Sequence, residues 1–311
     1  MTQTTRRPVE HQVVAGESPV IPKIDIVRQR LRRAWFGFLT LSGLGRRGFF
    51  IPHRYAEALP EAGFAPRYEA VEELFAHSHQ QFKEVLDDIQ SVADDLRAIG
   101  SAPPPAPRWH QGWFPRLDAA AAYALVRRYG PRRIVEVGSG HSTRFIASAI
   151  ERGEINCKIT AIDPAPRADI DKLPVTLLRT TLQQAGTAPF EGLVSGDFVM
   201  VDSSHILMPG SDVDFLLGRI LPLLPAGVLL QVHDIFLPDD YPAHWGWRAY
   251  NEQQGILPLL WSGNWEIVFA SHYVATRMSK TLEGSLLAEI TKPIDAVESS
   301  LWLRRKEPPA Q

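Results

Sequence analysis

The sequence predicts an α/β domain in which a mostly parallel, seven-stranded sheet carries helices on both faces, with a helical extension at the N-terminus. Three observations lead to this fold class. Short apolar runs rich in β-branched residues alternate with helical patterns from about residue 108 onward. The first of these runs, residues 134–137, ends in the sharp turn Gly138-Ser139-Gly140. Acidic residues close several of the later runs, where a parallel sheet would place its ligand.

The extension is expected to cover residues 1–107. Its first 22 residues are polar and contain three prolines, so we expect them to be mobile. Residues 24–44 mix arginines with aromatic side chains, and should pack on the main domain or on a second subunit in a homodimer, or lie on a membrane surface. Residues 68–99 have the three- and four-residue apolar spacing of one long helix. The proline run at 103–107 then marks the boundary of the catalytic domain, residues 108–311.

The catalytic domain shows a regular succession of elements. An alanine-rich helix at 117–129 precedes the first strand, and further helices are expected at 212–224 and 247–260. The expected strands are residues 134–137, 158–163, 175–178, 197–202, 228–232 and 265–269, with a late edge strand at 300–303.

Composition excludes several classes of protein. The formal net charge of −2 argues against a dedicated nucleic-acid binder. The single cysteine excludes an internal disulfide and a zinc–cysteine cluster. The first residues lack the apolar core of a signal peptide, and no early apolar run is long enough for stable membrane insertion. We therefore expect a soluble, cytoplasmic protein.

The glycine turn is the first candidate binding site. A dinucleotide site would have a third glycine where Thr143 stands, and Glu136 lies two residues before the turn. An acidic residue there disfavours a phosphate and suits a cationic ligand, or one with an amino group. Ser142 and Thr143 can cap the helix that follows. The alternative is a tight strand-to-helix turn that binds no ligand.

Asp163 closes the second expected strand, 27 residues after Glu136. A carboxylate at this place can accept two hydrogen bonds from ribose hydroxyls. The alternative is a helix N-cap, because Pro164 follows directly.

Two further aspartates, Asp202 and Asp234, end the fourth and fifth expected strands, and a histidine accompanies each of them. Carboxylates at neighbouring strand ends repel each other unless something positive lies between them, which a divalent cation would supply. His205 lies on a loop and ranks next as a ligand. The alternative is that Asp202 caps the next loop and that Asp234 pairs with an arginine.

His233 is expected to be a ligand or a general base toward a substrate hydroxyl. It precedes Asp234, and regular strand alternation would point the two side chains in opposite directions. His233 can therefore reach the same site only if the backbone turns at the end of the strand.

Together these motifs resemble a known family. The segments VEVGSGHSTRF, AIDP, FVMVDSSH and LLQVHDIF resemble the first, second, fourth and fifth strands of class I S-adenosylmethionine (SAM)-dependent methyltransferases, which have a Rossmann-like fold. HDIFLPDDYP and YNEQ look like the bacterial methyltransferase family 24 group. The resemblance implies SAM binding, with cofactor contacts from the following residues: Glu136, Gly138, Ser139, Gly140, Ser142, Thr143, Asp163 and Asp202.

The resemblance implies an enzyme that methylates a small-molecule hydroxyl, with help from a divalent metal (Mg, Mn or Fe) or a histidine. Catechol-type relatives hold a metal with two aspartates and an adjacent asparagine. Asp202 and Asp234 fit the first two positions, and Ile235 stands at the third. The alternative is a non-heme iron enzyme that has the same fold and transfers no methyl group. In it, His205, His233 and one aspartate would bind the iron ion.

Overall fold

The computed structural model describes residues 23–61, 63–65, 67–100 and 102–307. The first 22 residues, expected to be mobile, lie outside this range. The chain divides into two compact units, Met1–Pro52 and His53–Gln311. In the described part of the first unit the only regular element is α1 (Lys23–Leu41). Among the described residues, no helix combines the length and the apolar character needed to cross a membrane.

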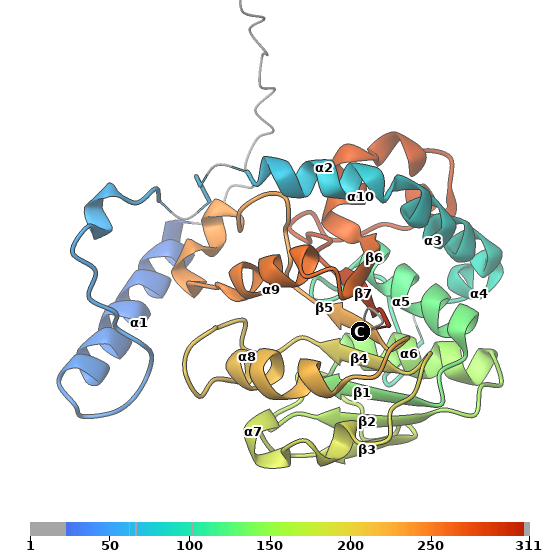
Figure 1. Cartoon of the computed structure of the whole chain (residues 1–311), viewed down its shortest axis with the longest axis horizontal. Helices are drawn as coiled ribbons and strands as arrows, with labels where there is room; N and C mark the ends of the chain where they lie inside the picture. The colour runs from blue at the N-terminus through green and yellow to red at the C-terminus, as the bar shows by residue number, and fades with distance from the viewer. Residues whose placement is uncertain (1–22, 62, 66, 101, 308–311) are drawn as a thin grey trace, which may run out of the picture. The chain divides into compact units, whose positions relative to one another are not determined.

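The second unit is built on a seven-stranded sheet, which confirms the predicted fold class. Its order is β3-β2-β1-β4-β5-β7-β6. The first five strands in this order pair in parallel, and β7 is antiparallel to both of its neighbours, β5 and β6. Figure 1 shows α8 and α9 on one side of this sheet and α5 and α6 on the other. The strands are β1 (Arg133–Val137), β2 (Lys158–Ile162), β3 (Val175–Leu178), β4 (Phe198–Val201), β5 (Leu229–Val232), β6 (Trp265–Ala270) and β7 (Leu301–Arg305).

The central strands are buried on both faces, as their unbroken apolar sequences predict. All four residues of β4 and of β5 are buried, including the polar Gln231, which donates a hydrogen bond to Ser300 Oγ at 3.0 Å. The covering helices are α5 (Arg116–Tyr129), α6 (His141–Arg152), α7 (Leu182–Ala185), α8 (Asp212–Phe215), α9 (Glu252–Trp261), α10 (Ser271–Arg277) and α11 (Leu286–Glu289).

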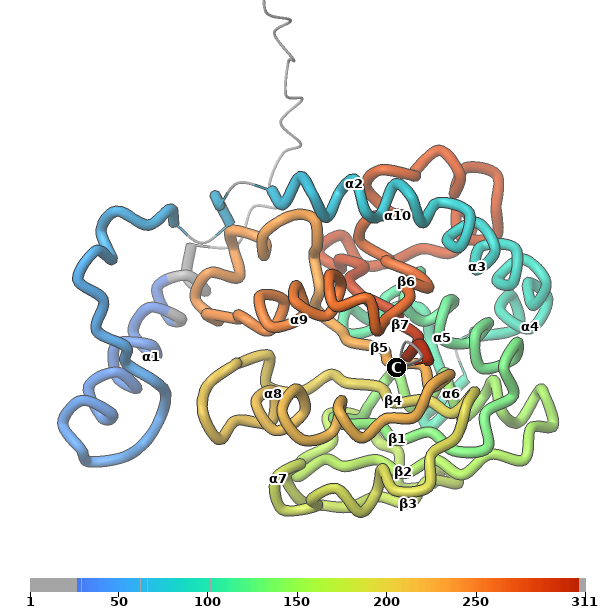
Figure 2. Tube along the Cα trace, viewed as in Figure 1, coloured from blue at the N-terminus to red at the C-terminus, as the bar shows by residue number. Residues whose placement is uncertain are grey.

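The late strand does not lie at the edge, contrary to expectation. β7 pairs with β5 on one side and with β6 on the other, antiparallel to both, and the trace in Figure 2 follows this insertion. The reason is burial: Leu301, Trp302 and Leu303 are almost fully inaccessible to solvent, which an edge position would not provide.

The prediction of a single long helix at residues 68–99 is also wrong. The structure divides it into α2 (Glu69–His77), α3 (His79–Ser91) and α4 (Ala93–Arg97). At Ser78 and Val92 the ψ angles are 9° and 19°, which interrupts the helical path while the apolar stripe stays buried. These helices belong to the same unit as the sheet, and α3 packs on α5 and β6. The boundary near residue 107 stays a prediction.

Two other helices are shorter than expected. Residues 212–224 form α8, one π-helical turn and a 3-10 turn that contains Pro222. Residues 247–260 contain the end of a 3-10 helix, Ala243–Arg248, and then most of α9, because Ala249 has a left-handed φ of 54° that separates the two.

Candidate active site

A cavity of about 470 Å³ opens at the carboxyl ends of β1, β2 and β4. This is the edge of an open parallel sheet at which ligands bind. The cavity has the size of a small-molecule site. Of the residues expected to bind the cofactor, it is lined by Gly138, Ser139, Asp163 and Asp202.

Gly138 is required by the protein's own packing. Its φ is 80°, and a Cβ atom added there would lie 1.9 Å from the carbonyl oxygen of Asp202. The close approach follows from strand pairing, since Asp202 N donates to Val137 O at 2.8 Å. The glycine therefore lets β1 and β4 end side by side at the cavity.

Asp163 ties the glycine turn to the end of β2. Its Oδ2 accepts hydrogen bonds from the Ser139 amide at 2.8 Å and from Ser139 Oγ at 3.0 Å. Its Oδ1 accepts from the Ala165 amide at 2.8 Å. No helix forms among the described residues between β2 and β3, so the alternative of a helix N-cap is wrong. Asp163 instead closes a local turn and also lines the cavity, and its role toward a ribose stays a prediction.

Glu136 lies behind the turn, buried between β1 and the start of α6. Ser142 Oγ and Thr143 Oγ1 each donate to its carboxylate at 2.5 Å, and Thr143 Oγ1 also accepts from Gly140 N at 2.9 Å. Burial raises the pKa of Glu136 to about 7, although the two hydroxyl donors oppose that shift. The first turn of α6 is thus fastened to β1.

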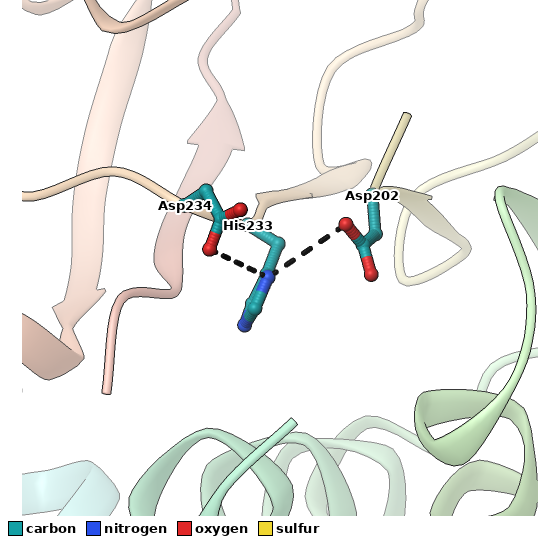
Figure 3. A group of neighbouring side chains, drawn as sticks. All are labelled: Asp202, His233 and Asp234. Atoms are coloured by element: carbon teal, nitrogen blue, oxygen red, sulfur yellow. Dashed lines mark ion pairs between the residues drawn. The ribbon is translucent and has the colours of Figure 1, made fainter. Parts of the chain in front are cut away.

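Asp202, His233 and Asp234 form the second part of the site, which Figure 3 shows. One ligand atom from each of them lies within 4.8 Å of the others. His233 Nδ1 is 3.2 Å from Asp234 Oδ1 and 3.8 Å from Asp202 Oδ1. Only the Asp202 side chain is substantially accessible, and Asp202 also lines the cavity, so this residue joins the two parts of the site.

The backbone turns at the end of β5, which is the condition for His233 and Asp234 to reach one site. β4 and β5 are adjacent and parallel, which brings Asp202 and Asp234 to one edge. Asp234 has a left-handed φ of 57°, so the side chains of His233 and Asp234 reach the same place. Ser299 supports this turn, because its Oγ donates to Asp234 Oδ1 at 3.2 Å and its carbonyl accepts from the Ile235 amide at 2.8 Å.

His205 folds back from its loop to the same aspartates. Its Nε2 lies 3.2 Å from Asp202 Oδ1 and 3.4 Å from Asp234 Oδ2, and its own φ is 59°. The compact three-residue cluster contains His233 and not His205. His205 Nε2 nevertheless lies as close to the two aspartates as His233 Nδ1 does, so the expected order of the two histidines as ligands stays a prediction.

Sequence analysis did not identify two buried carboxylates of the site. Each contacts the ring nitrogen of one histidine that faces away from Asp202 and Asp234. Glu252 Oε2 lies 2.8 Å from His205 Nδ1, and Asp118 Oδ2 lies 3.3 Å from His233 Nε2. Asp118 also accepts hydrogen bonds from the amides of Ser299 and Ser300. An acidic residue inside the alanine-rich run of α5 was the available signal for Asp118, and YNEQ contains Glu252.

The positive charges of the two histidines offset the negative charges of the carboxylates around them. Burial opposes the charged form of His233, but Asp234, Asp118 and Asp202 outweigh it and raise its pKa to about 9. The pKa of His205 is likewise raised well above its usual value, against burial, by Asp234, Asp202 and Glu252. Burial would raise the pKa of Asp202, yet the two histidines lower it to about 2. The aspartates and Glu252 therefore favour the protonated form of both imidazoles.

Comparison with known protein families supports this geometry. The family model described as "Methyltransferase domain" matches residues 135–235, the segment that contains the glycine turn, Asp163 and the Asp202–Asp234 cluster. Residues 135–235 are therefore assigned to a methyltransferase domain. The sheet order and the position of the cavity agree with this assignment. A search of curated proteins finds no match to this chain.

The solved structures that match this chain share little sequence with it. A putative O-methyltransferase from Klebsiella pneumoniae is 15% identical, with 90% of this chain and 100% of that chain covered and a TM-score of 0.38. An O-methyltransferase from Bacillus cereus in complex with S-adenosylhomocysteine (SAH) is 14% identical, with coverages of 72% and 91% and a TM-score of 0.37. A plantazolicin methyltransferase in complex with a pentazolic desmethylPZN analog and SAH is 13% identical, with coverages of 77% and 98% and a TM-score of 0.41.

Proposed function

We propose that this protein methylates a hydroxyl group of a small molecule, using SAM bound in the cavity and a divalent cation held beside it. The observation that carries the proposal is the position of Asp202. Its carboxylate lines the cavity and also belongs to the compact cluster with His233 and Asp234. An acceptor oxygen bound at the cluster would therefore lie next to the cofactor.

The residues around the glycine turn suit SAM. Bound SAM supplies a methyl group on a positively charged sulfur. Asp163 and Asp202 give the cavity an acidic lining that favours this charge, and Asp163 is placed for ribose hydroxyls at the end of β2. Gly138, Ser139 and Gly140 form the wall of the turn, while Glu136, Ser142 and Thr143 hold that wall in position from behind.

The donors of the cluster suit a divalent cation. Two carboxylates with one imidazole favour Mg²⁺, Mn²⁺ or Fe²⁺. Asp202 and Asp234 would be the main ligands and His233 the third, with His205 close enough to join or replace it. Asp118 and Glu252 would orient the two rings, as outer carboxylates do in metal sites.

The protonated histidines favour a metal over a metal-free base. A base whose pKa is about 9 is already protonated at neutral pH and cannot accept the proton of a hydroxyl. A cation between the aspartates would displace that proton, and would lower the pKa of a bound hydroxyl. The same carboxylates would therefore stabilise protonated histidines when no metal is bound, and would bind the cation when it is present.

The alternative is an iron enzyme without methyl transfer, in which His205, His233 and one aspartate would bind a single ion. The compact cluster has two aspartates and one histidine, which favours the oxygen-rich site of the methyl-transfer proposal.

The decisive experiment combines a metal inventory of the purified protein by mass spectrometry with transfer of labelled methyl from SAM to a panel of phenols and alcohols. We expect activity to disappear with a chelator and to return with Mg²⁺, Mn²⁺ or Fe²⁺. Asp234→Asn should lose metal and activity together, whereas Asp171→Asn, an exposed aspartate paired with Arg179, should keep both. Full activity in excess chelator would refute the metal. Bound iron with no methyl transfer to any acceptor would favour the alternative.

A further inference from the structure

In the first unit, residues 27, 28 and 30–52 contain no buried side chain. Large apolar residues follow one another at three- and four-residue spacing along α1, so they share one face of the helix. These are Val27, Leu31, Trp35, Phe38 and Leu41, and each is more than half exposed. We call this face the apolar stripe.

A second exposed apolar group follows the helix. Leu44, Phe49, Phe50 and Ile51 are all more than half exposed. In proteins, most of the stability of a helix such as α1 comes from packing of its apolar face. The stripe therefore requires a covering surface, and the described residues of its own unit do not provide one.

The charge of this segment indicates what covers it. The basic residues of 23–52 are Lys23, Arg28, Arg30, Arg32, Arg33, Arg46 and Arg47, and Asp25 is its single acidic residue. By helical geometry, Arg28 and Arg30 lie at the two borders of the stripe. Their long side chains can therefore reach anionic groups beside a surface that buries the stripe. Joining two copies of this segment would bring like charges together, which disfavours self-association.

We propose that residues 23–52 bind the surface of a membrane that contains anionic lipids, with the apolar stripe buried at the level of the headgroups. An apolar face bordered by arginines is the pattern of a helix that lies in the plane of a bilayer. No described helix can cross the membrane, so α1 lies on its surface. Of the three alternatives that the sequence left open for this segment, the proposal selects the membrane surface.

Flotation of the full-length protein with vesicles tests the proposal. We expect binding to vesicles of phosphatidylcholine with phosphatidylglycerol, weaker binding to phosphatidylcholine alone, and a loss of binding at high salt. Arg28→Ser with Arg30→Ser should weaken binding roughly tenfold or more. The matched control is Lys83→Ser with Lys280→Ser, which removes the same charge from exposed positions of the other unit.

A second pair of variants tests the stripe itself. Trp35→Ser should reduce flotation roughly tenfold or more, since it removes a large apolar side chain from the buried face. Trp261→Ser is the control, because Trp261 is 54% exposed against 56% for Trp35 and lies in α9. Equal flotation of the two variants would overturn the proposal. Absence of flotation, with a dimer in light scattering that Trp35→Ser abolishes, would instead assign the stripe to a second copy of the chain.

Discussion

Glu252 Oε2 lies 2.8 Å from His205 Nδ1, so a fully buried carboxylate from α9 fixes one imidazole of the candidate metal site. The other ring nitrogen, Nε2, is thereby directed at Asp202 and Asp234. His233 repeats the arrangement with Asp118. Each histidine thus has one carboxylate behind it and the two strand-end aspartates in front.

Glu252→Gln should weaken metal binding about 10- to 100-fold, because the ring of His205 loses the partner that orients it. Metal titration by calorimetry measures the effect. Glu252→Asp should restore part of the affinity if the carboxylate bond is responsible. An unchanged metal affinity in Glu252→Gln would show that His205 is not a ligand.

Asp163→Ala should weaken SAM binding about 10- to 150-fold, the effect of losing a hydrogen bond to a charged group. Titration calorimetry with SAM and with SAH measures it. Asp163 also accepts from Ser139, so Ser139→Ala is the control that removes only the hydroxyl contact. Parent-like affinity in Asp163→Ala would refute the ribose assignment.

Glu136 should make folding stability depend on pH. Its pKa in the folded protein is about 7, above the ordinary value of about 4.3, so the protonated form is favoured by folding. Protonated Glu136 therefore contributes stability that is fully present below about pH 4 and is lost as the pH rises through 7, by about 4 kcal/mol in total. Urea unfolding at pH 5 and pH 8 should show this loss in the parent, and a smaller one in Glu136→Gln. Identical pH dependence in both proteins would contradict it.

Gly138→Ala should be strongly destabilising, because the new Cβ would overlap the carbonyl oxygen of Asp202. The left-handed φ of 80° adds strain of about 1 kcal/mol or more. The control is Gly218→Ala, where a Cβ atom meets nothing within 4 Å. Thermal unfolding of the two variants compares them, and similar melting temperatures would show that β1 and β4 can separate at no cost.

The sequence by itself determined the sheet and its ligand edge. Apolar runs such as residues 198–201 can be buried only between two helical layers, and Asp163, Asp202 and Asp234 follow such runs directly. Chain-local patterns of this kind do not depend on distant partners. They therefore predicted the seven strands, the cavity edge and the convergence of Asp202 with Asp234.

Tertiary structure decided what depends on contacts between distant segments. β7 enters the sheet beside β5 because its apolar residues require burial, which no local pattern states. Asp118 and Glu252 lie 115 and 47 residues from the histidines that they contact. The left-handed backbone at Asp234, supported by Ser299, turns two consecutive side chains toward one point. The sequence places carboxylates at strand ends, but only the packed chain brings the histidines and their partners to them.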